Sequence, residues 1–299
     1  MTEFIVINEV GPRDGLQSQS KHVSLEGKLE LIRGFVKAGI RSIEAASFVS
    51  PKSVPQMADA DLLYPQLPEP GTVHYSALVP NLRGLERARA AGAKEIAVVL
   101  SATETMNQRN INMDLATSVA TCAATLKQAG EYGMRRKAYI AVAFECPYEG
   151  AVSIEQVLRL CDDMAAAGAD EIVIADTIGA ANPAQVKQLA TECVARFGAQ
   201  RLSAHFHDTR SFALANIWAA IEAGIRKFDS SIGGLGGCPF ATGAAGNVAT
   251  EDVAVFAAQC GFTTGVDIAA LRNVVATAER LVGQPLGGRI TRWLQSRAK

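Results

Sequence analysis

Short apolar runs alternate with longer amphipathic stretches along this chain, and the alternation predicts a repeated order of helix and strand. At four junctions a helical pattern ends at a glycine and a short β-prone run follows at once. These junctions are Ala38–Glu44, Ala91–Ile96, Ala167–Ile172 and Ala223–Phe228. A repeated unit of this kind indicates parallel strands joined by helical crossovers.

The pattern gives eight strand candidates with amphipathic stretches between them. Strands are expected at 4–10, 42–47, 74–79, 95–100, 138–144, 171–176, 202–207 and 227–232. Helices are expected at 24–38, 81–91, 112–132, 153–167, 184–197 and 212–223, with two more at 249–260 and 267–282. Eight evenly spread units favour an α/β fold, a single (β/α)8 TIM barrel with extra C-terminal helices, over a doubly wound sheet. Because no linker or shift in composition appears, we expect residues 1–299 to form a single domain.

Composition excludes several classes of protein. Hydrophobic residues make up 48% and charged residues 20%, which suits a globular protein with a sizeable core. The net charge of -1, without a basic stripe, argues against nucleic acid as a partner. No stretch approaches the ~20 apolar residues of a membrane span. The six cysteines are scattered without a C-x-x-C pair, so we expect a reduced, cytoplasmic setting.

Candidate chemistry gathers where the predicted strands end. Barrel enzymes carry their active sites on the loops that follow the carboxyl ends of the strands. Titratable or reactive side chains stand at such positions on at least five units: Arg13, Asp14, Glu44, Asp176, His205, His207 and Cys238. Charges placed by chance would scatter over both ends of the barrel. The sequence therefore predicts one functional rim.

His205 and His207 alternate along a predicted strand and should face the same side of it. Because strand eight closes against strand one, Asp14 should lie near them and complete a set of metal ligands. An oxygen ligand such as Asn247 would suit Mg²⁺ or Mn²⁺, whereas two histidines and one aspartate alone also suit Zn²⁺ or Fe²⁺. The alternative is a buried histidine–aspartate hydrogen-bond network without metal.

Arg13 is suited to stabilising an oxyanion or gripping a carboxylate at the barrel mouth. Its structural alternative is an ion pair with Glu44 or Asp14, and both descriptions can hold together. Glu44 and Asp176 should lie inside the rim, where they could orient the histidines or the arginine. Cys238 stands in a glycine-rich run and could act as a general acid or nucleophile, or be an inert thiol in a loop rich in glycine for packing.

Together these motifs resemble the 3-hydroxy-3-methylglutaryl-CoA lyase family. The resemblance extends to about Gly265 and is carried by Val10–Gln17, Ser47–Lys52, Cys146–Gly150, Asp176–Gly179, His205–Thr209 and the run from Gly234 through Cys238 and Pro239 to Asn247. It implies a divalent metal, Mg²⁺ or Mn²⁺, held by Asp14, His205, His207 and Asn247. It also implies an acyl-CoA substrate and a homodimer or higher homo-oligomer.

The reaction that the resemblance implies is a retro-Claisen cleavage to acetyl-CoA and acetoacetate. Arg13 would stabilise the enolate oxygen, Cys238 would transfer a proton, and His205 or Asp14 would lie near the proton of the tertiary hydroxyl. Glu44 and Asp176 would support the site. Gln17 and Ser47 lie in the shared motifs and are expected, with Arg13, to contact the substrate.

Two departures from the family pattern leave the acyl branch of the substrate open. Arg210-Ser211-Phe212 replaces Tyr-Gly-Gln, and Glu145 replaces the common glycine before Cys-Pro-Tyr. We expect Glu145 and Arg210 to pair with each other; the alternative is that they reshape the acyl pocket. The competing functions are a lyase for a related 3-hydroxyacyl-CoA, a condensing synthase, a non-haem Fe²⁺ oxygenase and an inactive metal-binding barrel.

Overall fold

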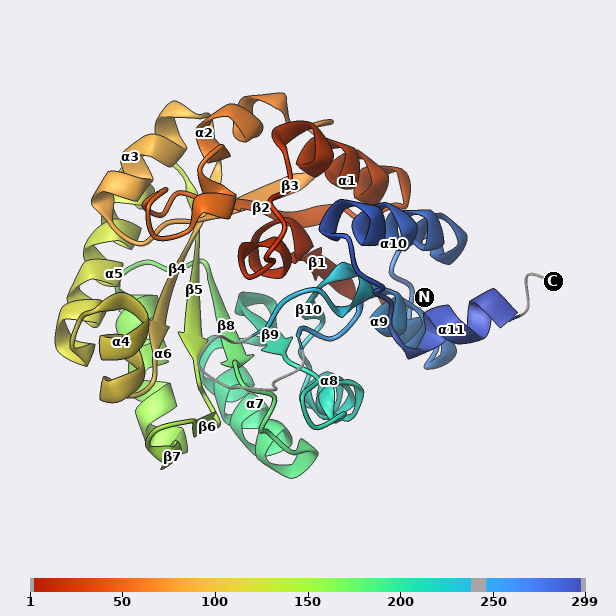
Figure 1. The fold of residues 1–299 in the computed structure, drawn as a ribbon. Helices are drawn as coiled ribbons and strands as arrows, with labels where there is room; N and C mark the ends of the chain where they lie inside the picture. The colour runs from red at the N-terminus through yellow and green to blue at the C-terminus, as the bar shows by residue number, and fades with distance from the viewer. Residues whose placement is uncertain (1–2, 238–245, 297–299) are drawn as a thin grey trace.

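Eight parallel strands close into a barrel surrounded by helices in the computed structural model, which describes residues 3–237 and 246–296 (Figure 1). The order around the barrel is β1-β10-β9-β8-β5-β4-β3-β2. The barrel strands are β1 (Val6–Glu9), β2 (Ser42–Ser47), β3 (His74–Leu78), β4 (Glu95–Ser101), β5 (Arg135–Ala141), β8 (Glu171–Asp176), β9 (Leu202–Phe206) and β10 (Lys227–Ser230). The predicted TIM barrel is confirmed.

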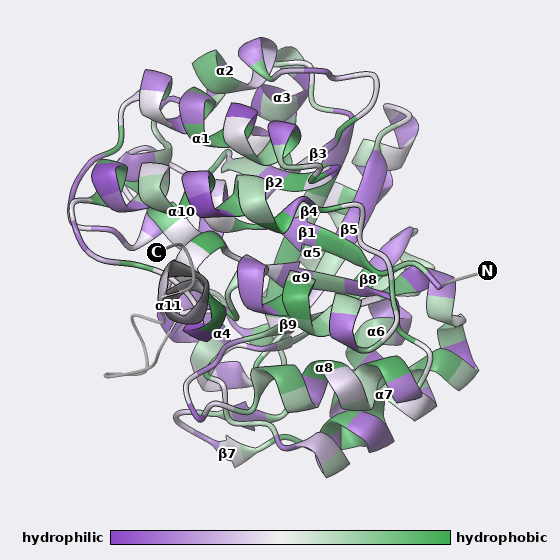
Figure 2. Ribbon diagram, turned by 90° about the vertical axis from the view of Figure 1, so that its right-hand side faces the viewer, coloured by the Kyte–Doolittle hydropathy of each residue, from purple (hydrophilic) through white to green (hydrophobic). Residues whose placement is uncertain are grey.

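The helices lie outside the barrel and cover its strands (Figure 1). Their bounds are α1 (Leu25–Lys37), α2 (Ala60–Leu63), α3 (Leu82–Ala90), α4 (Glu104–Ile111), α5 (Leu115–Glu131), α6 (Ile154–Ala166), α7 (Pro183–Phe197), α8 (Ala213–Glu222), α9 (Thr250–Gln259), α10 (Ile268–Val282) and α11 (Arg289–Ser296). Figure 2 shows green and purple residues following one another around outer helices such as α7 and α8, as expected when one face packs on the barrel. Among the described residues, none of these helices has the length and apolar character needed to cross a bilayer.

The helix expected at 112–132 is confirmed as α5 but begins later than predicted, at Leu115. Asn112 adopts a left-handed conformation (φ 54°) that ends α4, and the Asp114 side chain caps α5 by accepting from the Thr117 amide. The sequence pattern also missed α4 and α11. Both are short and carry several polar side chains, so their apolar periodicity is weak.

The fifth strand is shifted from its predicted bounds of 138–144. It begins at Arg135, where charged side chains hid the strand pattern, and it ends at Ala141. The next residue, Val142, has a φ of 49°, and its amide donates to Thr177 Oγ1 at 2.8 Å. This turn leads into a two-stranded hairpin of β6 (Glu145–Cys146) and β7 (Gly150–Ala151).

A layer of charged side chains fills the end of the barrel opposite the candidate rim. Lys137 Nζ lies 3.0 Å from Glu95 Oε1 and 3.8 Å from Glu171 Oε1, and all three side chains are buried. Lys227 Nζ lies 2.8 Å from the other oxygen of Glu171. Burial alone lowers the pKa of Lys137, but Glu95 and Glu171 raise it above its ordinary value, so this lysine stays charged.

Replacing Lys137 with Met is expected to lower the free energy of unfolding by about 3 kcal/mol, because a buried ion pair loses one partner. Urea unfolding measures the change. Lys227→Met is the control: Lys227 is more exposed, and Glu171 keeps Lys137, so its loss should be smaller. Equal losses in the two variants would contradict the assignment of Lys137 as the central cation.

Candidate active site

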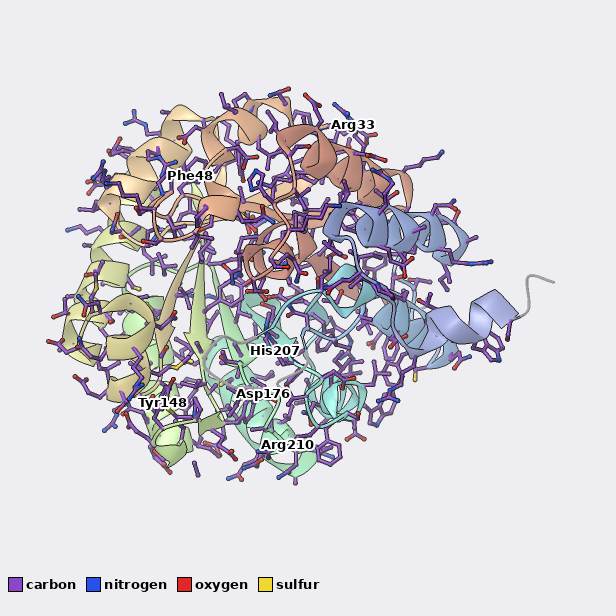
Figure 3. The ribbon with its side chains drawn as sticks, viewed as in Figure 1. Arg33, Phe48, Tyr148, Asp176, His207 and Arg210 are labelled. Atoms are coloured by element: carbon purple, nitrogen blue, oxygen red, sulfur yellow. The ribbon has the colours of Figure 1, made fainter. Side chains whose placement is uncertain are left out.

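A cavity of about 580 Å³ opens at the carboxyl ends of the barrel strands. Arg13, Asp14, His205 and His207 line it, together with Tyr139. In Figure 3, His207 lies closer to the middle of the barrel than Asp176 and Arg210 do, and Tyr148 lies toward the edge. The structure thus brings three of the four predicted metal ligands and the predicted arginine into one cavity.

A short, wide helical turn after β1, Gly11–Gly15, presents Arg13 and Asp14 to this cavity. The amides of Arg13, Asp14 and Gly15 all point to the Val10 carbonyl, at 3.1, 2.8 and 3.2 Å. Wide helical turns of this kind are frequent at functional sites. At Gly11 the backbone passes so close to Glu9 that a Cβ would lie 2.5 Å from its Oε1.

Asp14, His205 and His207 offer three ligand atoms that all lie within 4.8 Å of one another. Asp14 Oδ2 lies 4.0 Å from His207 Nε2. Asn247 is placed beside them because residues 206–208 and 246–248 pair in antiparallel fashion, with an Asp208 amide to Gly246 carbonyl bond of 3.1 Å.

Two polar atoms of this cluster are buried without a hydrogen-bond partner among residues 3–237 and 246–296. One is His207 Nδ1 and the other is Asn247 Oδ1. Asn247 donates through Nδ2 to Asp14 Oδ2 at 2.8 Å and to the Leu235 carbonyl at 3.1 Å. Because unpaired buried polar atoms are costly, the free amide oxygen beside two imidazoles and a carboxylate fits a divalent cation that accepts both oxygen and nitrogen ligands.

The protonation of two members of the cluster, Asp14 and His207, also suits a metal. Burial alone would raise the pKa of Asp14, but Arg13, the two histidines and the Asn247 amide lower it to about 2. Burial and the neighbouring His205 lower the pKa of His207 to about 4. At neutral pH the site therefore offers a carboxylate and a neutral imidazole, the forms that bind metal.

Arg13 is fixed by two carboxylates and is only 7% exposed. Its Nε donates to Glu44 Oε2 at 2.7 Å, Nη2 pairs with the same oxygen, and Nη1 donates to Asp14 Oδ1 at 2.5 Å. The predicted ion pair with Glu44 and Asp14 is confirmed. A guanidinium has five N–H groups, so each terminal nitrogen keeps one for a ligand.

Of the remaining predicted site residues, the Gln17 side chain contacts the metal cluster and the Asp176 side chain does not. Gln17 donates to Asp14 Oδ1 at 2.9 Å, and Ser47 Oγ is buried without a partner on β2. Asp176 was expected to orient the histidines or the arginine, but its two oxygens accept the Ala180 and Ala181 amides of its own loop, at 2.9 and 3.0 Å. Cys238 lies outside the described residues.

The sequence analysis missed a carboxylate beneath the site. Asp229 on β10 lies 3.0 Å from His205 Nδ1 and accepts the Tyr139 hydroxyl at 2.8 Å. A signal was present, because Asp229 is a charged residue in the middle of a predicted strand. Such a residue in a barrel interior needs buried polar partners.

Glu145 and Arg210 form the expected ion pair, with Nη2 of the arginine 3.1 Å from Oε1 of the glutamate. Arg210 also donates to the Ala180 carbonyl at 3.0 Å. Neither side chain lines the 580 Å³ cavity. The pair joins the β6–β7 hairpin to the loops after β8 and β9 without narrowing the cavity.

Comparison with known proteins assigns the family. The HMGL-like family model matches residues 5–277. The chain is 42% identical over 285 residues to the hydroxymethylglutaryl-CoA lyase YngG of Bacillus subtilis, covering 95% of each chain. It is 39% identical over 290 residues to a Pseudomonas aeruginosa protein named 3-hydroxy-3-isohexenylglutaryl-CoA/hydroxymethylglutaryl-CoA lyase, covering 97% of each.

A solved structure gives the same result. The HMG-CoA lyase of Acinetobacter baumannii in complex with coenzyme A and 3-methylmalate superimposes with a TM-score of 0.93 at 37% identity. The match covers 97% of this chain and 94% of that one. With its barrel, its cluster of two histidines and an aspartate, and these full-length matches, the chain belongs to the hydroxymethylglutaryl-CoA lyase family of carbon–carbon lyases.

Proposed function

We propose that this protein cleaves 3-hydroxy-3-methylglutaryl-CoA to acetyl-CoA and acetoacetate. The observation that carries the proposal is the placement of buried Arg13 2.5 Å from Asp14, within the same cavity as His205 and His207. Curated relatives that are about 40% identical over nearly the whole chain are named for this activity.

The divalent metal, Mg²⁺ or Mn²⁺, would be held by Asp14, His205, His207 and Asn247. When bound it supplies Lewis-acid chemistry, which lowers the cost of negative charge on substrate oxygens. The lowered pKa of Asp14 keeps it a carboxylate, and the lowered pKa of His207 keeps it a neutral imidazole. Neither residue therefore has to lose a proton before it binds the metal. Glycine at 246 supports this set, because a Cβ there would lie 2.3 Å from the Gly234 carbonyl oxygen and displace Asn247.

The reaction requires three events at the substrate. The tertiary hydroxyl loses its proton to His205 or Asp14, C3 becomes a ketone carbon, and the C2–C3 bond breaks. The electron pair of that bond forms the enolate of acetyl-CoA, whose oxygen Arg13 stabilises with its free N–H groups. Cys238 then supplies a proton to the enolate carbon.

Arg13 can stabilise the enolate oxygen because its neighbours fix the orientation of its guanidinium group. Glu44, itself fully buried, binds the Nε and Nη2 edge of the guanidinium and Asp14 binds Nη1, so the group has one orientation. Gln17 and Asn247 each donate to Asp14, which fixes the carboxylate that Arg13 also contacts. A donor that is oriented before the reaction does not spend free energy on reorganisation when the enolate charge develops.

The proposal is tested with purified protein loaded with Mg²⁺ or Mn²⁺ and supplied with 3-hydroxy-3-methylglutaryl-CoA. The expected result is release of acetyl-CoA and acetoacetate in equal amounts, and its loss in a Cys238→Ala variant. Absence of both products from protein that demonstrably binds the metal would contradict the proposal.

The two departures from the family pattern should not alter use of this substrate, because Glu145 and Arg210 do not line the cavity. For a double variant, Glu145→Ala with Arg210→Ala, we expect a KM unchanged within about threefold. The ion pair is solvent-exposed, so its removal should change the free energy of unfolding by less than about 1 kcal/mol. A KM raised tenfold or more would instead place the pair in substrate recognition.

We further propose that the protein acts in the cytoplasm as a homodimer or a higher homo-oligomer. The cytoplasmic setting is supported by the five cysteines of the described residues, all of which are free thiols. Sedimentation equilibrium tests the assembly, and a monomer at micromolar concentration would contradict it.

A further inference from the structure

A buried hydrogen-bond network lies directly beneath the candidate metal site and belongs to none of the proposed reaction steps. Asp229 on β10 is its centre and is 3% exposed. Its Oδ2 accepts the Tyr139 hydroxyl at 2.8 Å and lies 3.0 Å from His205 Nδ1. Its Oδ1 accepts Asn8 Nδ2 at 2.7 Å.

The network fixes Asp229 from several strands. Asn8 on β1 receives a hydrogen bond from Ser42 on β2, with 2.8 Å between Ser42 Oγ and Asn8 Oδ1. Because an ionised Asp229 can only accept, the Asn8 amide nitrogen has to face it, and Asn8 Oδ1 is left to accept from Ser42. Both oxygens of Asp229 are therefore engaged, and the carboxylate cannot turn away from His205.

The hydrogen bond to Asp229 determines which nitrogen of the His205 ring carries the proton. An ionised carboxylate only accepts hydrogen bonds, so the His205 nitrogen beside it must carry the proton. In the neutral ring this leaves Nε2 with a free lone pair, and Nε2 is the nitrogen that remains to join Asp14 and His207 as a ligand.

We propose that Asp229 is a positioning residue that holds His205 as the Nδ1–H tautomer, with Nε2 directed to the metal. The inference rests on the proposed function only in taking His205 to be a metal ligand; with both of its ring nitrogens engaged, Asp14 is the group that takes the hydroxyl proton. A carboxylate bound to the far nitrogen of a ligating histidine fixes the orientation of the ring and strengthens it as a ligand.

The second histidine provides an internal contrast. His207 Nδ1 is buried but has no hydrogen-bond partner in the part of the chain that the structure describes. The rings of His205 and His207 are close, with centroids 5.1 Å apart, yet only one of them has a carboxylate behind it. The two histidines should therefore differ before metal binds, with the tautomer of His205 set by Asp229 and that of His207 not set by a side-chain partner.

The test measures Mn²⁺ affinity from the electron paramagnetic resonance signal of the free ion, so it does not depend on catalysis. For Asp229→Asn we expect affinity about 10-fold weaker, and for Asp229→Ala about 100-fold weaker, the range found for such partners of ligating histidines. The substituted asparagine keeps an oxygen that accepts from His205. Asn8 can turn its amide so that its oxygen accepts from the nitrogen of that asparagine, so this variant is expected to fold. Ser42→Ala is the matched control, because it removes the far end of the network and should leave Mn²⁺ affinity unchanged.

A second readout is the nitrogen NMR spectrum of metal-free protein labelled in its four histidines. We expect one ring in the Nδ1–H form, identified as His205 by its absence from a His205→Gln variant, and loss of that form in Asp229→Ala. Wild-type Mn²⁺ affinity in both Asp229 variants, or a neutral His205 ring with its proton on Nε2 in the unsubstituted protein, would overturn the proposal. If Asp229→Ala does not fold, unchanged affinity in Asp229→Asn overturns it alone. Neither readout requires substrate, so failure here is distinct from failure of the proposed cleavage.

Discussion

Replacement of Arg13 by Lys is expected to lower kcat for cleavage of 3-hydroxy-3-methylglutaryl-CoA by about 10³-fold, the upper range for loss of one oxyanion donor. Arg13 bonds Glu44 and Asp14 at once and still has N–H groups for the substrate. An ammonium group is a compact charge that cannot reproduce this planar, many-sided contact. The developing enolate charge would then lose its oriented partner. Steady-state kinetics with saturating metal measures the effect.

Arg136→Lys is the matched control for this substitution. Arg136 is also an arginine paired with a carboxylate, since its Nη2 lies 2.9 Å from Asp170 Oδ1, but it lies at the start of β5, at the opposite end of the barrel. Its kcat should stay near that of the unsubstituted protein. If Arg13→Lys retained more than a tenth of kcat, Arg13 would have only a structural role in the ion pair.

Removal of the divalent metal by a chelator is expected to reduce cleavage to the uncatalysed background, and addition of Mg²⁺ or Mn²⁺ is expected to restore it. The fold should persist without metal, because Asp14 keeps its bonds to Arg13, Gln17 and Asn247. Bound metal should nevertheless stabilise the protein, by about 2.7 kcal/mol at a concentration 100 times the Kd. The melting temperature should therefore rise with metal concentration.

His207→Gln removes one ligand of the proposed site. It should therefore weaken both the restoration of cleavage by added metal and the rise of the melting temperature with metal concentration. His74→Gln is its control, because His74 is an exposed histidine at the start of β3. Full activity in chelator, with metal shown to be absent, would contradict the assigned role of the Asp14, His205 and His207 cluster.

The barrel was predictable from the sequence because its helix and strand periods recur with glycine at the junctions. The errors occurred where local chemistry outweighs periodicity. The helix expected at 112–132 starts later than predicted, because Asn112 forms the left-handed turn that ends α4 and the Asp114 side chain caps the start of α5. In the fifth strand, Lys137 faces the interior as a charged residue because Glu95 and Glu171 meet it there, and no pattern of apolar residues can reveal partners on other strands.

The convergence of site residues was also predictable, because a parallel barrel brings all strand ends to one rim. Arg13, Asp14, His205, His207 and Asn247 meet there as expected. The contacts of Asp176 were not predictable, since its partners are backbone amides of its own loop. Asp229 was missed for a related reason: its role depends on which of its neighbours is a histidine, and that depends on register between strands.

Hydrogen isotope incorporation tests the central claim most directly. Metal-loaded protein in deuterated water is supplied with 3-hydroxy-3-methylglutaryl-CoA, and the acetyl-CoA formed is analysed by mass spectrometry. Cleavage through an enolate that is protonated in the site predicts acetyl-CoA carrying a single deuterium in its methyl group. Acetyl-CoA without deuterium, or no acetyl-CoA from protein that has bound its metal, would contradict the account.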